Sequence, residues 1–141
     1  MKILIINGPN LNLLGIREPE IYGNESLSDI ENWLNEQLEV ADHSITWFQS
    51  NHEGELIDRI QEARGNADGI IINPGAFTHY SYAIRDAIAA VNIPTVEVHL
   101  SNIHDREDFR KVSVIKDVCL NQFSGLGKTG YLKGIQQLII F

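Results

Sequence analysis

Cysteine is the scarcest reactive residue of this 141-residue sequence, because Cys119 is its single copy. One cysteine cannot form a disulfide within its own chain, so the sequence suits a reducing compartment. Cys119 also lies in an apolar segment. We therefore expect it to be a small buried hydrophobic side chain and not a reactive thiol.

The sequence is also poor in basic residues and in long apolar runs. It has 11 lysines and arginines against 19 aspartates and glutamates, a formal net charge of −8. General nucleic-acid binders and proteins of anionic membranes use basic surfaces, so we expect neither kind of partner. The apolar run 3–6 is too short for a signal peptide, and no stretch approaches the roughly 18 apolar residues of a membrane span. We expect a soluble, cytoplasmic protein.

Several common catalytic arrangements are missing as well. The five histidines do not stand at ligand spacing with cysteines or paired carboxylates, which disfavours a metal site. The sequence has no Gly-x-Ser-x-Gly elbow, and no lysine stands at a strand end as a Schiff-base former would. Residues 125–130 match the glycine pattern of dinucleotide-binding turns, but they open the last helix instead of the first βα turn. We therefore expect no cofactor, and acid-base chemistry on a small anion remains.

What the sequence does contain is an alternation of apolar strands with amphipathic helices. The expected strands are 3–6, 45–49, 69–73, 95–102 and 119–123, and the expected helices cover 27–38, 56–63, 83–91 and 131–138. Ser26 and Asp29 form a capping-box pattern before the first helix. This alternation predicts an α/β fold, a flavodoxin-like three-layer sandwich whose five-stranded parallel sheet has the order 2-1-3-4-5. A single domain over residues 1–141 is expected.

Polar residues gather at one predicted edge of this sheet. Ligands of such folds bind outside the carboxyl ends of the strands, near the switch point between strands 1 and 3. The polar residues that fall at or beyond those ends are Asn10, Tyr22, Asn73, His79, His99 and Ser101. This edge is therefore the expected ligand site.

The strand 95–102 carries the clearest indication of chemistry. It is apolar like a buried strand, yet the alternation of strand side chains places Glu97 and His99 side by side on one face. A carboxylate beside an imidazole fixes the tautomer and favours the imidazolium, so His99 could donate a proton to a leaving hydroxyl. The alternative is a purely structural Glu–His hydrogen bond in the core.

The segment 8–25 has neither a helical nor a strand period, and a connection of that length is usually a functional lid or disordered. It contains Tyr22 and Arg17. Tyrosine is a poor base at neutral pH unless a cation stabilises its phenolate, and Arg17 is the nearest candidate in the sequence. The side-chain amides of Asn10 and Asn73 could hold a water molecule or an enolate oxygen.

Two arginines follow the Glu97–His99 strand. Arg106 and Arg110 offer guanidinium groups for a carboxylate. Pairing with the acidic residues at 105, 107 and 108 is an equally good alternative.

Five motifs, in order and over essentially the whole chain, resemble those of type II 3-dehydroquinate dehydratase. They are NGPNLNLLG at 7–15, REP at 17–19 with YG at 22–23, QSNHEGE at 49–55, NPGA at 73–76 with TH at 78–79, and EVHLSN at 97–102. The resemblance implies a flavodoxin-like fold and the reversible dehydration of 3-dehydroquinate to 3-dehydroshikimate in the shikimate pathway. It also implies that neither a metal nor a Schiff base takes part.

By matching position, the resemblance implies a role for each motif residue. Tyr22 is the base that removes the proton alpha to the ketone, and Arg17 stabilises its phenolate. Asn10 holds the water that contacts the enolate. His99, oriented by Glu97, is the acid that expels the hydroxyl as water.

The remaining implied residues bind the substrate or belong to the assembly. Those implied to bind its hydroxyls and carboxylate are Asn73, His79, Arg110 and the amides around Leu100 and Ser101. Asp86 is implied to reach the site of a neighbouring subunit in a homododecamer of four trimers. Phe77, where many members have tyrosine, and the extra charge of Asp105 point to an altered substrate affinity.

Two other classes of function remain open at this point. One is a non-catalytic flavodoxin-like module that holds a small anion at the same edge without transforming it. The other is a nucleotide-binding subunit that uses residues 125–130.

Overall fold

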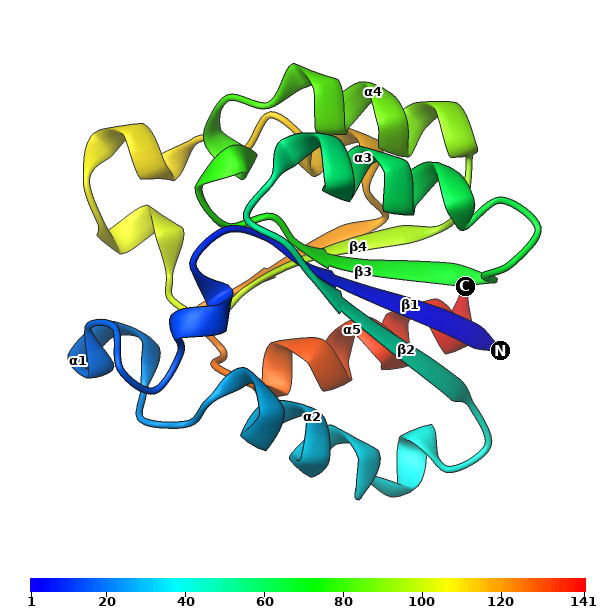
Figure 1. The fold of residues 1–141 in the computed structure, drawn as a ribbon, viewed down its shortest axis with the longest axis horizontal. Coiled ribbons are helices and arrows are strands. Elements are labelled where there is room, and N and C mark those ends of the chain that lie inside the picture. Colours follow the sequence, from blue (N-terminus) through cyan, green and yellow to red (C-terminus); the bar gives the residue numbers. More distant parts are fainter.

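A five-stranded parallel sheet forms the centre of the computed structural model, which describes all residues from 1 to 141 (Figure 1). Its strands are β1 (Lys2–Asn7), β2 (Ser44–Gln49), β3 (Gly69–Asn73), β4 (Thr95–His99) and β5 (Asn121–Ser124). All neighbouring strands are parallel and follow the order β2-β1-β3-β4-β5. The predicted flavodoxin-like α/β fold is confirmed.

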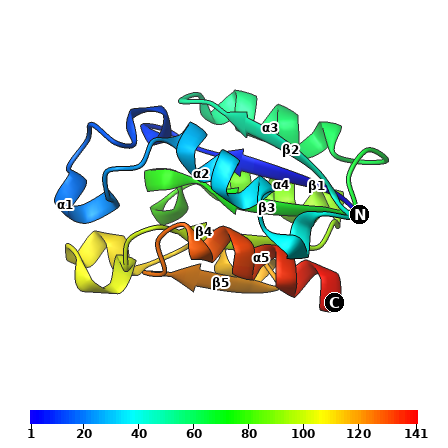
Figure 2. The same ribbon diagram turned by 90° about the horizontal axis from the view of Figure 1, so that it is seen from below.

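Helices cover both faces of the sheet. Figure 1 shows α3 (Glu53–Glu62) and α4 (Tyr82–Val91) above it and α2 (Leu27–Asn35) and α5 (Thr129–Ile140) below it. The view from below in Figure 2 shows α2 and α5 in front of the strands. Apolar side chains of the sheet pack into one cluster under α2 and α5 and into a second under α3 and α4. Burial on both faces explains why the central strands read as continuous apolar runs. None of the helices is long and apolar enough to cross a lipid bilayer.

The capping box before α2 is confirmed, but the predicted end of this helix is wrong. Ser26 Oγ accepts a hydrogen bond from the Asp29 amide, and the Asp29 carboxylate accepts one from the Ser26 amide. The helix ends at Asn35, and the chain turns through the extended backbone of Gln37. This turn brings Val40 into the core and leaves Leu38 exposed, although Leu38 fits the helical spacing.

The predicted limits of the last two strands are also wrong. β4 ends at His99, whose register partner Ser124 is the last residue of β5. Just beyond, Gly125 has a left-handed backbone with φ of 78°, and its amide donates to the carbonyls of both His99 and Ser101. β5 begins at Asn121, after a 3₁₀ turn over Lys116–Val118. Cys119 therefore lies outside the strand, half-buried against the core under α4, and burial raises the pKa of its thiol.

The segment between β1 and α2 is ordered by two short turns. A 3₁₀ turn covers Leu11–Leu13, and the single-turn helix α1 covers Pro19–Tyr22. Leu11 and Leu14 are buried in the core under α2 and anchor the segment there. Figure 1 shows α1 at the carboxyl ends of the strands, beside the yellow segment that follows β4. Turns of this length carry no readable period, which is why the sequence did not reveal them.

Gly8 joins the ends of β1 and β3. Its amide donates to the Asn73 carbonyl over 2.8 Å, and a Cβ atom at this position would lie 2.5 Å from the Pro74 carbonyl oxygen. Both neighbours are backbone atoms, so no side-chain rotation could relieve the contact. Only glycine allows the carboxyl ends of β1 and β3 to approach this closely.

Gly8→Ala should therefore force the two strand ends apart. We expect the free energy of unfolding to fall by about 1–3 kcal/mol, the usual range for an overpacked site. Gly54→Ala in α3 is the matched control, because an added Cβ there meets no atom within 4 Å. That control should keep or slightly raise stability, since alanine is the better helix former. Urea denaturation of both variants at one protein concentration checks the difference, and equal stabilities would contradict it.

Candidate active site

A cavity of about 200 Å³ opens at the carboxyl ends of β1, β3 and β4. Its walls come from the segment after β1, the turn after β3, the end of β4 and the two arginines that follow β4. The predicted site residues that line it are Asn10, Arg17, Tyr22, Asn73, His79, His99, Leu100, Ser101 and Arg110. Of the predicted set, Glu97 lies behind His99, and only Asp86 lies away from the cavity, exposed on α4.

The Glu97 and His99 side chains form a buried pair on β4. His99 Nε2 lies 2.6 Å from Glu97 Oε1, and the glutamate side chain is fully shielded from solvent. Burial disfavours the charged carboxylate, but hydrogen bonds from His99, Thr78 and Ser113 and the charge of His99 outweigh it and hold the pKa of Glu97 below its ordinary value. Because Nε2 faces Glu97, Nδ1 is the ring nitrogen that remains for a ligand.

Thr78 and Ser113 complete this group, and neither was assigned a role from the sequence. The Thr78 hydroxyl donates to Glu97 Oε1, and the Ser113 hydroxyl lies 2.9 Å from both carboxylate oxygens. Thr78 belongs to the turn after β3, while Ser113 lies in the segment between β4 and β5. Their roles depend on contacts between distant segments, so spacing along the chain held no signal for them.

Tyr22 contacts two guanidinium groups. Arg106 Nη1 donates to the phenol oxygen over 2.7 Å, whereas Arg17 lies over the ring with its Cζ atom 4.8 Å from the centroid. The sequence suggested Arg17 as the cation for Tyr22 and left Arg106 to carboxylate binding or a surface ion pair. In the structure Arg106 is the group on the oxygen, and Arg17 adds positive charge beside the ring.

His79 presents a hydrogen-bond acceptor, its Nε2 atom, to the cavity. Its Nδ1 lies 2.7 Å from the Val112 carbonyl, which can only accept, so Nδ1 carries the proton and Nε2 has a free lone pair. Burial lowers the pKa of His79, and the nearby positive charges of His99 and Arg110 add to this against the effect of the Val112 hydrogen bond. A neutral imidazole at the cavity wall can accept a hydrogen bond from a ligand hydroxyl.

The far wall offers donors for an anion. Arg110 donates from Nε to Glu107 over 2.6 Å, which is one of the ion pairs left open by the sequence, while no hydrogen bond within the chain uses its Nη groups. The amides of Leu100 and Ser101 also donate no hydrogen bond within the chain. Together with the guanidinium groups near Tyr22, these donors make the cavity positive in a chain of net charge −8. The arrangement suits a small carboxylate.

Asn10 and Asn73 lie on the remaining walls. Asn10 has a left-handed backbone with φ of 68°, and its amide donates to Asn51 Oδ1 over 2.9 Å. Asn73 is buried at the end of β3, with its side-chain oxygen 3.2 Å from the amide of Gly75. The loop at Asn51 thus holds the backbone of Asn10 at the cavity, and Gly75 holds the side-chain amide of Asn73.

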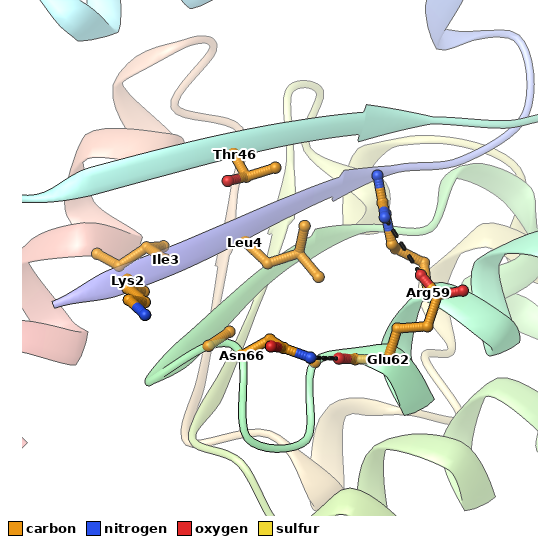
Figure 3. Close-up of a pocket in the computed structure, with 9 residues that line it drawn as sticks. Lys2, Ile3, Leu4, Thr46, Arg59, Glu62 and Asn66 are labelled. Carbon is orange, nitrogen blue, oxygen red and sulfur yellow. Dashed lines mark hydrogen bonds and ion pairs between the residues drawn. The ribbon is translucent and has the colours of Figure 1, made fainter.

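A second cavity, also of about 200 Å³, lies between α3 and the starts of β1 and β2 (Figure 3). Arg59 pairs there with Glu62 over 3.2 Å, and Asn66 donates to the Glu62 carbonyl. No predicted site residue lines it. Of its charged side chains, Arg59 and Glu62 pair with each other, and the cavity is separate from Tyr22 and from the Glu97–His99 pair.

The turn at residues 125–130 does not present a phosphate cradle. The amides of Gly125 and Gly127 donate to the carbonyls of residues 99–101, at the end of β4 and just beyond it. Those amides are therefore not free for a nucleotide, and the turn instead supports the loop after β4. No group of three His, Cys, Asp or Glu side chains is placed to hold a metal ion.

Comparison with known proteins agrees with this geometry. The family described as dehydroquinase class II matches residues 1–139. The 3-dehydroquinate dehydratase of Clostridium beijerinckii is 58% identical over 139 residues, which cover 98% of this chain and 95% of that protein. The crystal structure of type II dehydroquinase from Butyrivibrio crossotus superposes with a TM-score of 0.95 at 55% identity, covering 99% of this chain and 97% of that one. The corresponding structure from Propionibacterium acnes gives a TM-score of 0.93 at 36% identity, with the same coverage of both chains. The resemblance of the five motifs is confirmed, and the chain belongs to the class II dehydroquinase family.

Proposed function

We propose that the protein catalyses the reversible dehydration of 3-dehydroquinate to 3-dehydroshikimate, a step of the shikimate pathway. Two relatives named for this activity are each 58% identical to the chain, over 98% and 92% of its length. The observation that carries the proposal is the pairing of two proton-transfer groups at one cavity. The Tyr22 phenol is bound by Arg106 over 2.7 Å, and the His99 imidazole is bound by Glu97 over 2.6 Å.

Tyr22 acts as the base in the first step. Its phenolate, stabilised by Arg106 and Arg17, takes a proton from the carbon next to the ketone. The electron pair of the broken C–H bond moves toward the ketone oxygen and forms an enolate. Asn10 holds a water molecule against this oxygen, which stabilises the developing charge.

His99 acts as the acid in the second step. Its Nδ1 proton passes to the leaving hydroxyl, the carbon–oxygen bond breaks, and water departs. The enolate electrons restore the ketone and form the new carbon–carbon double bond. Glu97 orients the imidazole and balances its positive charge before the transfer. The reverse reaction follows the same steps in the opposite order.

The remaining residues of the cavity wall bind and orient the substrate. Arg110 and the amides of Leu100 and Ser101 bind its carboxylate. His79 accepts a hydrogen bond from a hydroxyl through Nε2, and Asn73 contributes its side-chain amide.

The proposal includes a cytoplasmic homododecamer of four trimers, in which Asp86 reaches the cavity of a neighbouring subunit. Its support is the exposed position of Asp86 on α4, away from the cavity of its own chain. Light scattering should then give a mass near twelve times the 15.9 kDa of the chain. A monomeric species with full activity would contradict this assembly.

The activity itself is tested by adding 3-dehydroquinate to chelator-treated protein at neutral pH and following the absorbance of the conjugated enone product. We expect turnover without added metal or cofactor. Saturable binding of the substrate without turnover or proton exchange at the alpha carbon would contradict the proposal and favour the non-catalytic binding module.

Tyr22→Phe should lower turnover by about 10²- to 10⁴-fold, because it removes the base while leaving the ring in place. Binding of shikimate-like acids, measured by calorimetry, should persist. Wild-type turnover in this variant would remove Tyr22 from its role.

Arg106→Gln should lower turnover at neutral pH by about 10- to 100-fold, the usual effect of losing one charge-assisted hydrogen bond. Binding of shikimate-like acids should persist, because Arg110 and the amides of Leu100 and Ser101 remain. Arg64→Gln removes an equal charge from an exposed position outside the cavity and serves as the control. Equal turnover in the two variants would rule out Arg106 as the stabilising cation.

Acid should destabilise the fold through Glu97. The pKa of Glu97 is lower in the folded protein, so its stabilising effect is present above pH of about 4.5 and is lost as the pH falls through the folded-state pKa. We expect the free energy of unfolding to fall more steeply between pH 5 and 3 in the wild type than in Glu97→Gln, which cannot take up this proton. Urea denaturation at fixed protein concentration measures both slopes, with Glu36→Gln at the exposed end of α2 as the control. Parallel slopes in the wild type and Glu97→Gln would contradict the expectation.

A further inference from the structure

A buried tyrosine on α5 contacts Asn73, one of the residues that line the cavity. Tyr131 lies on α5, is completely shielded from solvent, and packs its ring against Trp47 with 5.5 Å between the centroids. Its hydroxyl lies 2.5 Å from Asn7 Oδ1 and 3.4 Å from Asn73 Nδ2. Asn7 and Asn73 are register partners at the ends of β1 and β3. Of these residues only Asn73 lines the cavity, so the mechanism above leaves Tyr131 and Asn7 without a role.

The direction of each hydrogen bond in this group is fixed by one backbone amide. The Gly75 N–H can only donate, so the atom of Asn73 that faces it over 3.2 Å is the oxygen. The nitrogen of Asn73 then faces Tyr131 and donates to its hydroxyl oxygen. The single proton of that hydroxyl is left to donate to Asn7 Oδ1.

The reverse direction is not available to this group. It would place the Asn73 nitrogen against the Gly75 N–H, with two donors facing each other. The phenol must also keep its proton to donate to Asn7, and burial raises the pKa of Tyr131 against the smaller effect of the Asn73 hydrogen bond. The chain of hydrogen bonds ends at Asn7 Nδ2, which is buried without a partner. A buried unpaired donor costs stability, so its presence calls for an explanation.

We propose that Tyr131, supported by Asn7, is a positioning residue that fixes which way the Asn73 amide faces the cavity. One N–H of Asn73 is used by Tyr131 and one lone pair of its oxygen by Gly75, which leaves one donor and one acceptor in a fixed arrangement for a ligand. In this arrangement Asn7 Nδ2 stays without a partner, which lowers the stability of the fold. The proposal rests on the proposed function, because it assigns Tyr131 to substrate binding through Asn73.

Tyr131→Phe removes the hydroxyl and keeps the ring against Trp47. The KM for 3-dehydroquinate should rise about fivefold to tenfold, as expected for one misplaced neutral hydrogen bond, while kcat stays within about twofold. A merely structural defect would instead lower the active fraction and hence kcat, with KM unchanged. Trp47→Phe is the matched control, because it disturbs packing around Tyr131 without touching the hydrogen bonds. It should leave KM unchanged.

A double-mutant cycle separates action through Asn73 from any other effect. In an Asn73→Ala background, Tyr131→Phe should cause no further change in KM. An unchanged KM in the single Tyr131→Phe variant, or the same rise in both backgrounds, overturns the proposal. Asn7→Ala, which removes the acceptor of the hydroxyl, should raise KM in the same way and replaces Tyr131→Phe if that variant does not fold.

A crystal structure of Tyr131→Phe gives a readout that does not depend on activity. The Asn73 amide should be rotated or present in two orientations, and an amide in its wild-type position with its Gly75 contact intact would overturn the proposal. If the wild-type protein does not turn over 3-dehydroquinate, the proposed function fails, while this structure still decides whether Tyr131 positions Asn73.

Discussion

The buried carboxylate of Glu97 on β4 is the constraint on which the rest of the site depends. An unpaired charge in the core would cost several kcal/mol, so the fold must bring hydrogen-bond donors to it. These donors are His99 on the same strand, Thr78 after β3 and Ser113 between β4 and β5. Satisfying Glu97 therefore ties three segments together and fixes the imidazole that faces the cavity. The residues that make the charge tolerable therefore also hold His99 in place at the cavity.

Tyr22 and His99 contact groups of opposite charge. The phenol of Tyr22 is flanked by the guanidinium groups of Arg106 and Arg17, whereas the imidazole of His99 is paired with the carboxylate of Glu97. Under the proposed function this contrast distinguishes the base from the acid, because a cation stabilises a phenolate and a carboxylate stabilises an imidazolium.

Local pattern was enough for the fold and for the edge of the sheet where the cavity opens. Period-two alternation put Glu97 beside His99, and the order of strands followed from the alternation of strands and helices. The contact of Arg106 with Tyr22 joins residues 84 positions apart, and that of Tyr131 with Asn73 joins residues 58 apart. Such contacts depend on how loops pack at the end of the sheet, which no spacing in the sequence encodes. The predicted end of the first helix at Leu38 was wrong for a related reason, since the backbone turn at Gln37 overrode the helical spacing of Leu38.

The floor of the cavity links the stability of the sheet to the chemistry above it. Asn7 and Asn73 can share Tyr131 only because β1 and β3 end at the same level and Gly8 lets their ends approach closely. The hydroxyl of Tyr131 comes from α5, on the face opposite the Glu97 carboxylate. The two faces of the sheet thus support different parts of the site: α5 holds the amide of Asn73 from below, while the turn after β3 holds Glu97 from the other side. A parallel sheet buried on both faces can therefore fix both walls of a cavity at its edge, because each face contributes an independent set of buried polar contacts.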